Sequence, residues 1–113
     1  MIISIKNKKF KVKTVFSPKD TSKGMMNRRF DSTFNGMLFL MDGDEQCFWM
    51  KNCITSLDII MIDGNTITKV LHDCPPCVDD DCPSYCGDGD IVLELEGGTC
   101  KKLGIQEGDE VIF

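Results

Sequence analysis

The stretch LDIIMIDGNTITKVL, residues 57–71, contains the pattern that decides the fold class of this chain. Two apolar runs, Leu57 to Ile62 and Thr66 to Leu71, surround the turn sequence Asp63-Gly64-Asn65. Short runs rich in β-branched residues on either side of an Asp-Gly or Gly-Asn signal are typical of a β-hairpin. The sequence therefore predicts two neighbouring antiparallel strands here.

The same pattern occurs earlier in the chain, over residues 36–50. An apolar run from Gly36 to Met41 precedes Asp42-Gly43-Asp44, and a second run from Cys47 to Met50 follows. This is the clearest hairpin signal in the sequence. Alternating or apolar runs predict further strands at 3–5, 10–16, 91–95 and 110–113, the first two joined as a hairpin through Asn7-Lys8.

Two segments favour short helices. One covers 19–28, with Pro18 or Asp20 in its first turn, and the other is a single turn at 99–103 with Thr99 as its cap and Gly104 at its end. Many short strands with little helix are typical of a small β-barrel. We therefore expect a mainly β (α+β) fold, a small barrel or rolled antiparallel sheet of six to seven short strands with one short helix and a long cysteine-rich loop.

Length and charge limit the organisation of the chain and the partners it can attract. A chain of 113 residues corresponds to one domain, 1–113, and its net charge of -5 gives no general attraction to nucleic acid or to anionic membranes. Five lysines gather between residues 6 and 13, where they are expected to form the solvated face of an edge hairpin. The sequence thus predicts no nucleic-acid or membrane partner.

The first residues of the chain bear on its location. Met1 to Lys6 lack the apolar core and cleavage site of a secretory signal, and no run is long enough to span a bilayer. These features predict a cytoplasmic location, in which the seven cysteines should mostly remain reduced.

Several motifs then point to a family. These are GMMNR at 24–28, GMLF at 36–39, FWMKN at 48–52 with LDII at 57–60, and GDEV at 108–111. In order and spacing the chain resembles the family called domain of unknown function 192. The resemblance implies a compact β-barrel-like fold with a helix packed on it, and it implies no established activity.

The clearest candidate for a chemically active site is a group of cysteines within an acidic loop at 73–90. Cys74, Cys77, Cys82 and Cys86 form two closely spaced pairs, and His72 lies just before them. Four soft ligands of this kind suit tetrahedral zinc, with His72 able to replace one thiolate. Free thiols and disulfides are the alternatives, and four cysteines allow three pairings that the sequence does not distinguish.

A second constellation surrounds Asp58, which lies inside an apolar run where an unpaired carboxylate is costly. Lys51, Asn52 or Arg28 are the partners the sequence offers. The candidate ligand-binding residues are Arg28, Trp49, Lys51, Asn52, Asp58 and Tyr85.

Three functions remain open from the sequence. The first is a non-catalytic module that binds a small ligand or a protein near Trp49. The second is a zinc-stabilised domain, and the third is an enzyme that uses Lys51 and Asp58. Whether the chain is an enzyme stays open, because no nucleophile with its own base is recognisable.

Overall fold

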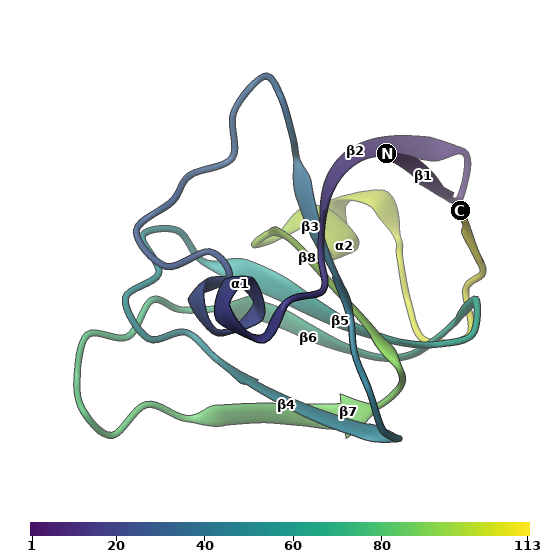
Figure 1. Cartoon of the computed structure of the whole chain (residues 1–113). Helices are drawn as coiled ribbons and strands as arrows, with labels where there is room; N and C mark the ends of the chain where they lie inside the picture. The colour runs from purple at the N-terminus through teal and green to yellow at the C-terminus, as the bar shows by residue number, and fades with distance from the viewer.

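A computed structural model describes residues 1–113, which form nine strands and two short helices (Figure 1). The elements are β1 (Ile2–Ile5), β2 (Lys8–Val15), α1 (Pro18–Lys23), β3 (Gly36–Leu40), β4 (Glu45–Trp49), β5 (Leu57–Asp63), β6 (Thr66–Cys74), β7 (Ser84–Asp88), β8 (Ile91–Glu96), α2 (Thr99–Leu103) and β9 (Val111–Ile112). Neither helix is long and apolar enough to cross a membrane.

Seven of the strands form one curved sheet in the order β6-β5-β8-β3-β2-β1-β9. All neighbours are antiparallel except β2 and β3, which are parallel. The two ends of the sheet approach each other, because the Val111 amide donates to the Asn65 carbonyl at 2.8 Å and the Gly108 amide donates to the Ile67 carbonyl at 2.8 Å. The sheet is therefore nearly closed, which confirms the predicted barrel-like, mainly β fold.

The central strands of this sheet are buried on both faces. One apolar cluster fills the inside of the curved sheet and includes Ile60, Leu93 and Cys100 of α2. The other covers the outside and includes Met61 and Val92. Because successive side chains alternate between faces, two covered faces require the continuous apolar runs that the sequence shows.

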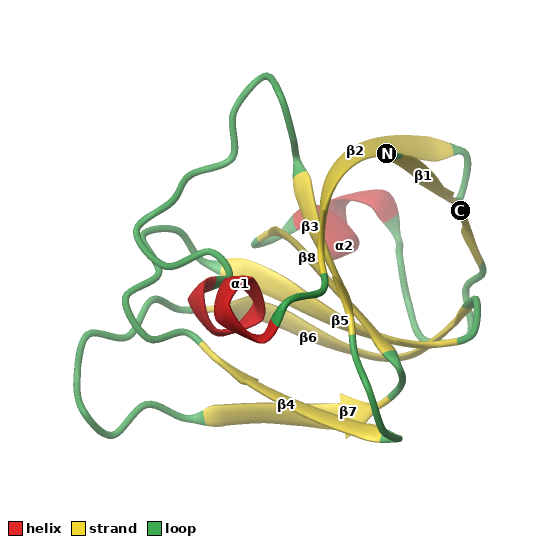
Figure 2. Cartoon of the chain, viewed as in Figure 1, coloured by secondary structure: helices red, strands yellow, loops and turns green.

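A two-stranded ribbon of β4 and β7 covers part of the outer face, and α1 lies beside it (Figures 1 and 2). This arrangement shows that the hairpin predicted over residues 36–50 is wrong. β3 pairs with β2 and β8, whereas β4 pairs only with β7. The physical reason is burial: four of the five β3 residues are buried, so β3 needs a neighbour on each side, while β4 leaves the sheet after the Asp42-Gly43 turn.

The other predicted hairpins are confirmed, as β1 pairs with β2 and β5 with β6. Helix α1 is shorter than predicted because Gly24, at φ 45°, ends it after Lys23. Its start is capped by Ser17, whose hydroxyl accepts from the Asp20 amide at 3.2 Å. Helix α2 covers the predicted residues, but Gly98 rather than Thr99 is its N-cap.

The region 73–90 is not one irregular loop, since it contains the end of β6 and all of β7. Its cysteines also contradict the predicted zinc site. Cys86 forms a disulfide with Cys47 across the ribbon, and Cys77 forms one with Cys82. Cys74 is a buried free thiol.

The four thiols of the predicted zinc set are therefore not free to meet at one ion. No group of three or more potential metal ligands, whether His, Cys, Asp or Glu, gathers in the structure. The expectation that the cysteines stay mostly reduced is also wrong, because four of the seven cysteines form disulfides. Cross-strand pairing of β4 with β7 brings residues 47 and 86 together, and sequence spacing gives no sign of it.

Candidate ligand pocket

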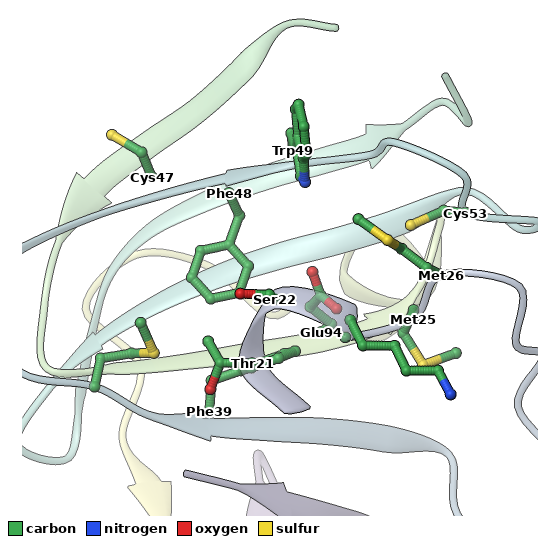
Figure 3. Close-up of a pocket in the computed structure, with 13 residues that line it drawn as sticks. Thr21, Ser22, Met25, Met26, Phe39, Cys47, Phe48, Trp49, Cys53 and Glu94 are labelled. Atoms are coloured by element: carbon green, nitrogen blue, oxygen red, sulfur yellow. The ribbon is translucent and has the colours of Figure 1, made fainter. Parts of the chain in front are cut away.

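The candidate site is a pocket on the outer face of the sheet, where α1, the ribbon and the large sheet meet (Figure 3). Its volume is about 280 Å³. That volume is near the lower end for small-molecule sites, which begin at roughly 300 Å³. The lining residues come from α1 and the turn after it, from β3, β4 and β8, and from the segment that follows β4.

Helix α1 supplies the polar part of the wall. Thr21 and Ser22 present their hydroxyl groups, and Lys23 lies at the exposed end of the helix. Gly24 ends the helix with a φ of 45°, a conformation that favours glycine, and it lies against the Phe39 ring.

Three aromatic rings form most of the apolar wall. Phe39 from β3 and Phe48 from β4 meet edge to face, with ring centroids 4.9 Å apart. Trp49 follows on β4 and remains 48% exposed at the rim of the pocket. Methionine side chains complete this wall, namely those of Met25, Met26 and Met41.

Glu94 is the acidic residue of the pocket, and it lies on the central strand β8. Its side chain is on the same face as Val92 and is only 3% exposed. No hydrogen bond or ion pair from a protein group reaches its carboxyl oxygens, which are open to the cavity rather than fully enclosed, and Figure 3 shows them projecting toward the space between Met26 and Phe48. Burial raises the pKa of this carboxyl from 4.5 to about 8, so the group is mostly protonated at neutral pH.

Two free thiols lie near this acid. Burial raises the pKa of Cys53 to about 11, and the charge of Glu94 adds to the effect. The Cys74 thiol behaves in the same way, with a pKa of about 11 caused first by burial and then by Asp58 and Glu94. Both thiols are therefore neutral and unreactive near pH 7.

Trp49 alone among the sequence-predicted ligand residues lines this pocket. Lys51 instead holds the 77–82 loop, since its ammonium donates to the Val78 carbonyl at 3.2 Å and to the Asp79 carbonyl. It also pairs with Asp80 at 3.5 Å. Asn52 exchanges backbone hydrogen bonds, donating to Cys77 and accepting from Asn27, both at 2.8 Å.

Asp58 lies on the opposite face of the sheet, inside the barrel, and is fully buried. Its carboxylate accepts hydrogen bonds from three backbone amides, those of Asp73 at 2.8 Å, Gly98 at 3.1 Å and Cys100 at 2.8 Å. The last two amides belong to the start of α2, so Asp58 caps this helix from a neighbouring strand. Its partners are not the Lys51, Asn52 or Arg28 side chains that the sequence offered, and Lys51 and Asp58 form no pair.

The remaining predicted residues lie apart from one another. Arg28 stacks over the Phe34 ring, 5.5 Å from its centroid, in a different part of the surface. Tyr85 is half-buried on β7, and desolvation raises its pKa. His72 is exposed on β6.

Sequence reasoning missed Glu94, although the signal was present. The residue interrupts the apolar run Ile91 to Leu95 in the same way that Asp58 interrupts its own run. Because burying a carboxylate without a partner is costly, a carboxylate inside an apolar run indicates a special environment at both positions. Pattern alone does not tell which of the two meets backbone amides and which faces a pocket.

The fold and the pocket together define a small barrel-like domain with a ligand-sized pocket on its outer face. The chain belongs to the family DUF192, described as "Uncharacterized ACR", whose model matches residues 1–113. The predicted family is thus confirmed. No curated protein matches the chain.

Two solved structures share the fold. One is a protein of unknown function from Novosphingobium aromaticivorans, with 27% identity and a TM-score of 0.84. The match covers 99% of this chain and 84% of the Novosphingobium chain. The other, from Sinorhizobium meliloti, is described as a "putative transcription regulator" and has 26% identity and a TM-score of 0.85, with 97% and 90% of the two chains covered.

Proposed function

We propose that this protein is a non-catalytic module that binds a small, largely apolar molecule in the pocket between α1 and β4. The observation that supports the proposal is Glu94, whose side chain is largely buried, forms no hydrogen bond or ion pair with a protein group, and opens its carboxyl oxygens to an apolar cavity. Buried polar groups normally have hydrogen-bond partners. A group that lacks one inside a ligand-sized cavity is suited to meet the polar part of a ligand.

The rest of the lining fits this role. Binding sites for small molecules are mainly apolar and carry a few polar groups that orient the ligand. Here the polar groups are the hydroxyls of Thr21 and Ser22 and the carboxyl of Glu94. Trp49 at the rim gives the ligand an aromatic surface and leaves an entrance open to solvent.

A direct role in nucleic-acid binding is not part of this proposal. The net charge of -5 disfavours contact with phosphates, and the lysines of residues 6–13 lie on β2 and on the turn before it and do not line the pocket. A regulatory role, as in the description of the Sinorhizobium meliloti protein, would fit a module that senses a small molecule.

The test is a fragment screen followed by NMR with isotope-labelled protein. We expect a subset of compact apolar fragments to shift the backbone resonances of residues 21–26, 48–49 and 94, and to change the fluorescence of Trp49, the only tryptophan. Ser22→Phe, which fills the pocket from an exposed position of α1, should abolish both effects. Lys19→Phe, at an exposed position of the same helix outside the pocket, should leave them intact.

The proposal would be overturned by a diverse panel that shifts no pocket resonance, or by fragments that bind Ser22→Phe and the unmodified protein equally well.

A further inference from the structure

We propose that the ligand of this pocket is an ammonium ion with apolar substituents, held between the carboxylate of Glu94 and the ring of Phe48, with Trp49 at the exposed rim. The inference rests on the proposed function, because it names the class of ligand for the same site. It goes further in assigning a charge to that ligand and a role to each wall of the pocket.

Glu94 has no charged or hydrogen-bonded partner within the protein. Its carboxyl is 3% exposed, yet no arginine, lysine or backbone amide is bound to it. Asp58 provides a comparison: it is a buried carboxylate with a structural role, and three backbone amides donate hydrogen bonds to it. A buried carboxylate is stabilised by an opposite charge, and the open side of Glu94 faces the cavity. A cationic ligand would supply the missing partner.

The walls that face Glu94 are suited to a cation with apolar substituents. Aromatic faces attract cations through the ring quadrupole. The Phe48 ring lies on the ribbon side of the cavity, opposite the sheet that carries Glu94, whereas Trp49 extends from the other face of β4 at the rim (Figure 3). Met25 and Met26 add polarisable sulfur atoms that contact alkyl groups well. An ammonium group with methyl, alkyl or aryl substituents matches both surfaces at once.

The charges around Glu94 also favour a cationic ligand. The ionisable groups near Glu94 are the thiols of Cys53 and Cys74, and among the lining residues the ammonium of Lys23. The Lys23 side chain belongs to an exposed residue at the end of α1, so its charge is screened by solvent. The whole chain carries a net charge of -5, which favours the approach of cations and opposes that of anions.

The protonation of Glu94 gives the proposal a sharp test. Burial holds the pKa of the empty site at about 8, so at pH 6 to 7 the acid must release its proton when a cation binds. The affinity for a permanent cation should therefore rise roughly tenfold per pH unit up to about pH 8 and then level off. A neutral ligand that accepts a hydrogen bond from the protonated acid would show the opposite trend. The thiols of Cys53 and Cys74, with pKa values of about 11, stay neutral over this range.

The experiment is calorimetric titration of the intact protein with three probes. We expect 2-phenylethylamine to bind at least about tenfold more tightly at pH 7 than its neutral isostere 2-phenylethanol. Benzyltrimethylammonium should show the pH dependence described above and should release about one proton per molecule bound at pH 6.5, measured in buffers of different ionisation enthalpy. Glu94→Gln should remove the preference for the amine and the proton release while the alcohol still binds.

The outcomes separate the two proposals. Equal binding of amine and alcohol, or an affinity that falls as the pH rises, overturns the ammonium assignment and leaves the pocket as a binding site. Failure of all three probes, together with a silent fragment screen, overturns both. An acetylated trimethyl-lysine amide, added as a fourth probe, distinguishes an ammonium on a peptide side chain from one on a free small molecule, according to which class binds more tightly.

Discussion

At the scale of single residues, two buried carboxyl groups on adjacent strands have opposite environments. Asp58 accepts three backbone hydrogen bonds inside the barrel, whereas Glu94 faces a cavity on the outside and has no protein partner. The first group fixes the position of α2 on the sheet. The second remains free to interact with a molecule that enters the pocket.

Glu94 should make the stability of the protein depend on pH. Its pKa is raised from 4.5 to about 8 by burial, so below pH 4.5 the group is protonated in both the folded and the unfolded states. Between these values the unfolded chain loses the proton and the folded protein keeps it. The free energy of unfolding should therefore fall as pH rises, by up to about 1.4 kcal/mol per unit, and level off above about pH 8.

Urea unfolding at a series of pH values measures this trend. Glu94→Gln should lose this part of the decline and exceed the unmodified protein in stability at pH 8. Glu96→Gln, at the exposed end of the same strand, should keep the decline. Identical pH profiles for Glu94→Gln and the unmodified protein would contradict the expectation.

Asp58 should contribute strongly to stability. Asp58→Asn replaces one accepting oxygen with an NH₂ group that faces amide donors, so we expect a loss of about 2–4 kcal/mol. The free energy of unfolding from urea titration is the measurement. Asp63→Asn, at the exposed end of the same strand, should change it by less than about 0.5 kcal/mol. A small effect at Asp58 would mean that α2 does not depend on this cap.

At the scale of elements, the turn between β7 and β8 sets the ribbon against the large sheet. Gly89 has a φ of 152°, and its amide donates to the Asp44 carbonyl at 2.8 Å. A Cβ at this position would lie 2.9 Å from the Ile62 carbonyl carbon. The close approach therefore requires glycine.

Gly89→Ala should destabilise the protein by about 2–4 kcal/mol, because backbone strain adds to a clash with main-chain atoms. Gly43→Ala serves as the matched control. Gly43 also has a positive φ, 86°, but no atom lies within 4 Å of its added Cβ, so its loss should stay near 1 kcal/mol. Thermal unfolding of both variants measures the difference, and equal losses would show that the contact with Ile62 has no cost.

The disulfides belong to the same scale, since one joins β4 to β7 and the other closes the loop after β6. In protein denatured without reductant, we expect a thiol titration to count three free thiols, those of Cys53, Cys74 and Cys100. After reduction and denaturation the count should rise to seven. Seven thiols before reduction would contradict both pairings. Because disulfides are rare in the cytosol, the count also tests the cytoplasmic location, which stays a prediction.

At the scale of the whole molecule, the ribbon forms one wall of the pocket without belonging to the large sheet. Phe48 and Trp49 reach the pocket from β4, and β4 has β7 as its only paired neighbour. The Cys47–Cys86 disulfide links the two strands over a sequence separation of 39 residues. The affinity of the pocket should therefore depend on this link.

Replacing Cys47 and Cys86 together by serine should lower the free energy of unfolding by about 3–4 kcal/mol in the chain-entropy model. Amide hydrogen exchange should quicken in β4 and β7 more than in β5 and β8, and binding of 2-phenylethylamine should weaken. The double serine variant of Cys77 and Cys82, whose loop spans only 5 residues, should lose about 2 kcal/mol and bind the amine normally. Uniformly faster exchange in all four strands would contradict an independent ribbon.

The mainly β class, the β1–β2 and β5–β6 hairpins and both helices could be predicted from the amino-acid sequence, because they depend on local turn signals, on caps and on the periodicity of apolar residues. The family could be predicted from the resemblance of several short motifs. The pairing of β4 with β7, the contact of Cys47 with Cys86, and the different surroundings of Asp58 and Glu94 became visible only in the folded structure. Each of these depends on contacts between residues far apart in the chain. Local pattern shows that a carboxylate or a cysteine is buried, but packing alone determines which group it meets.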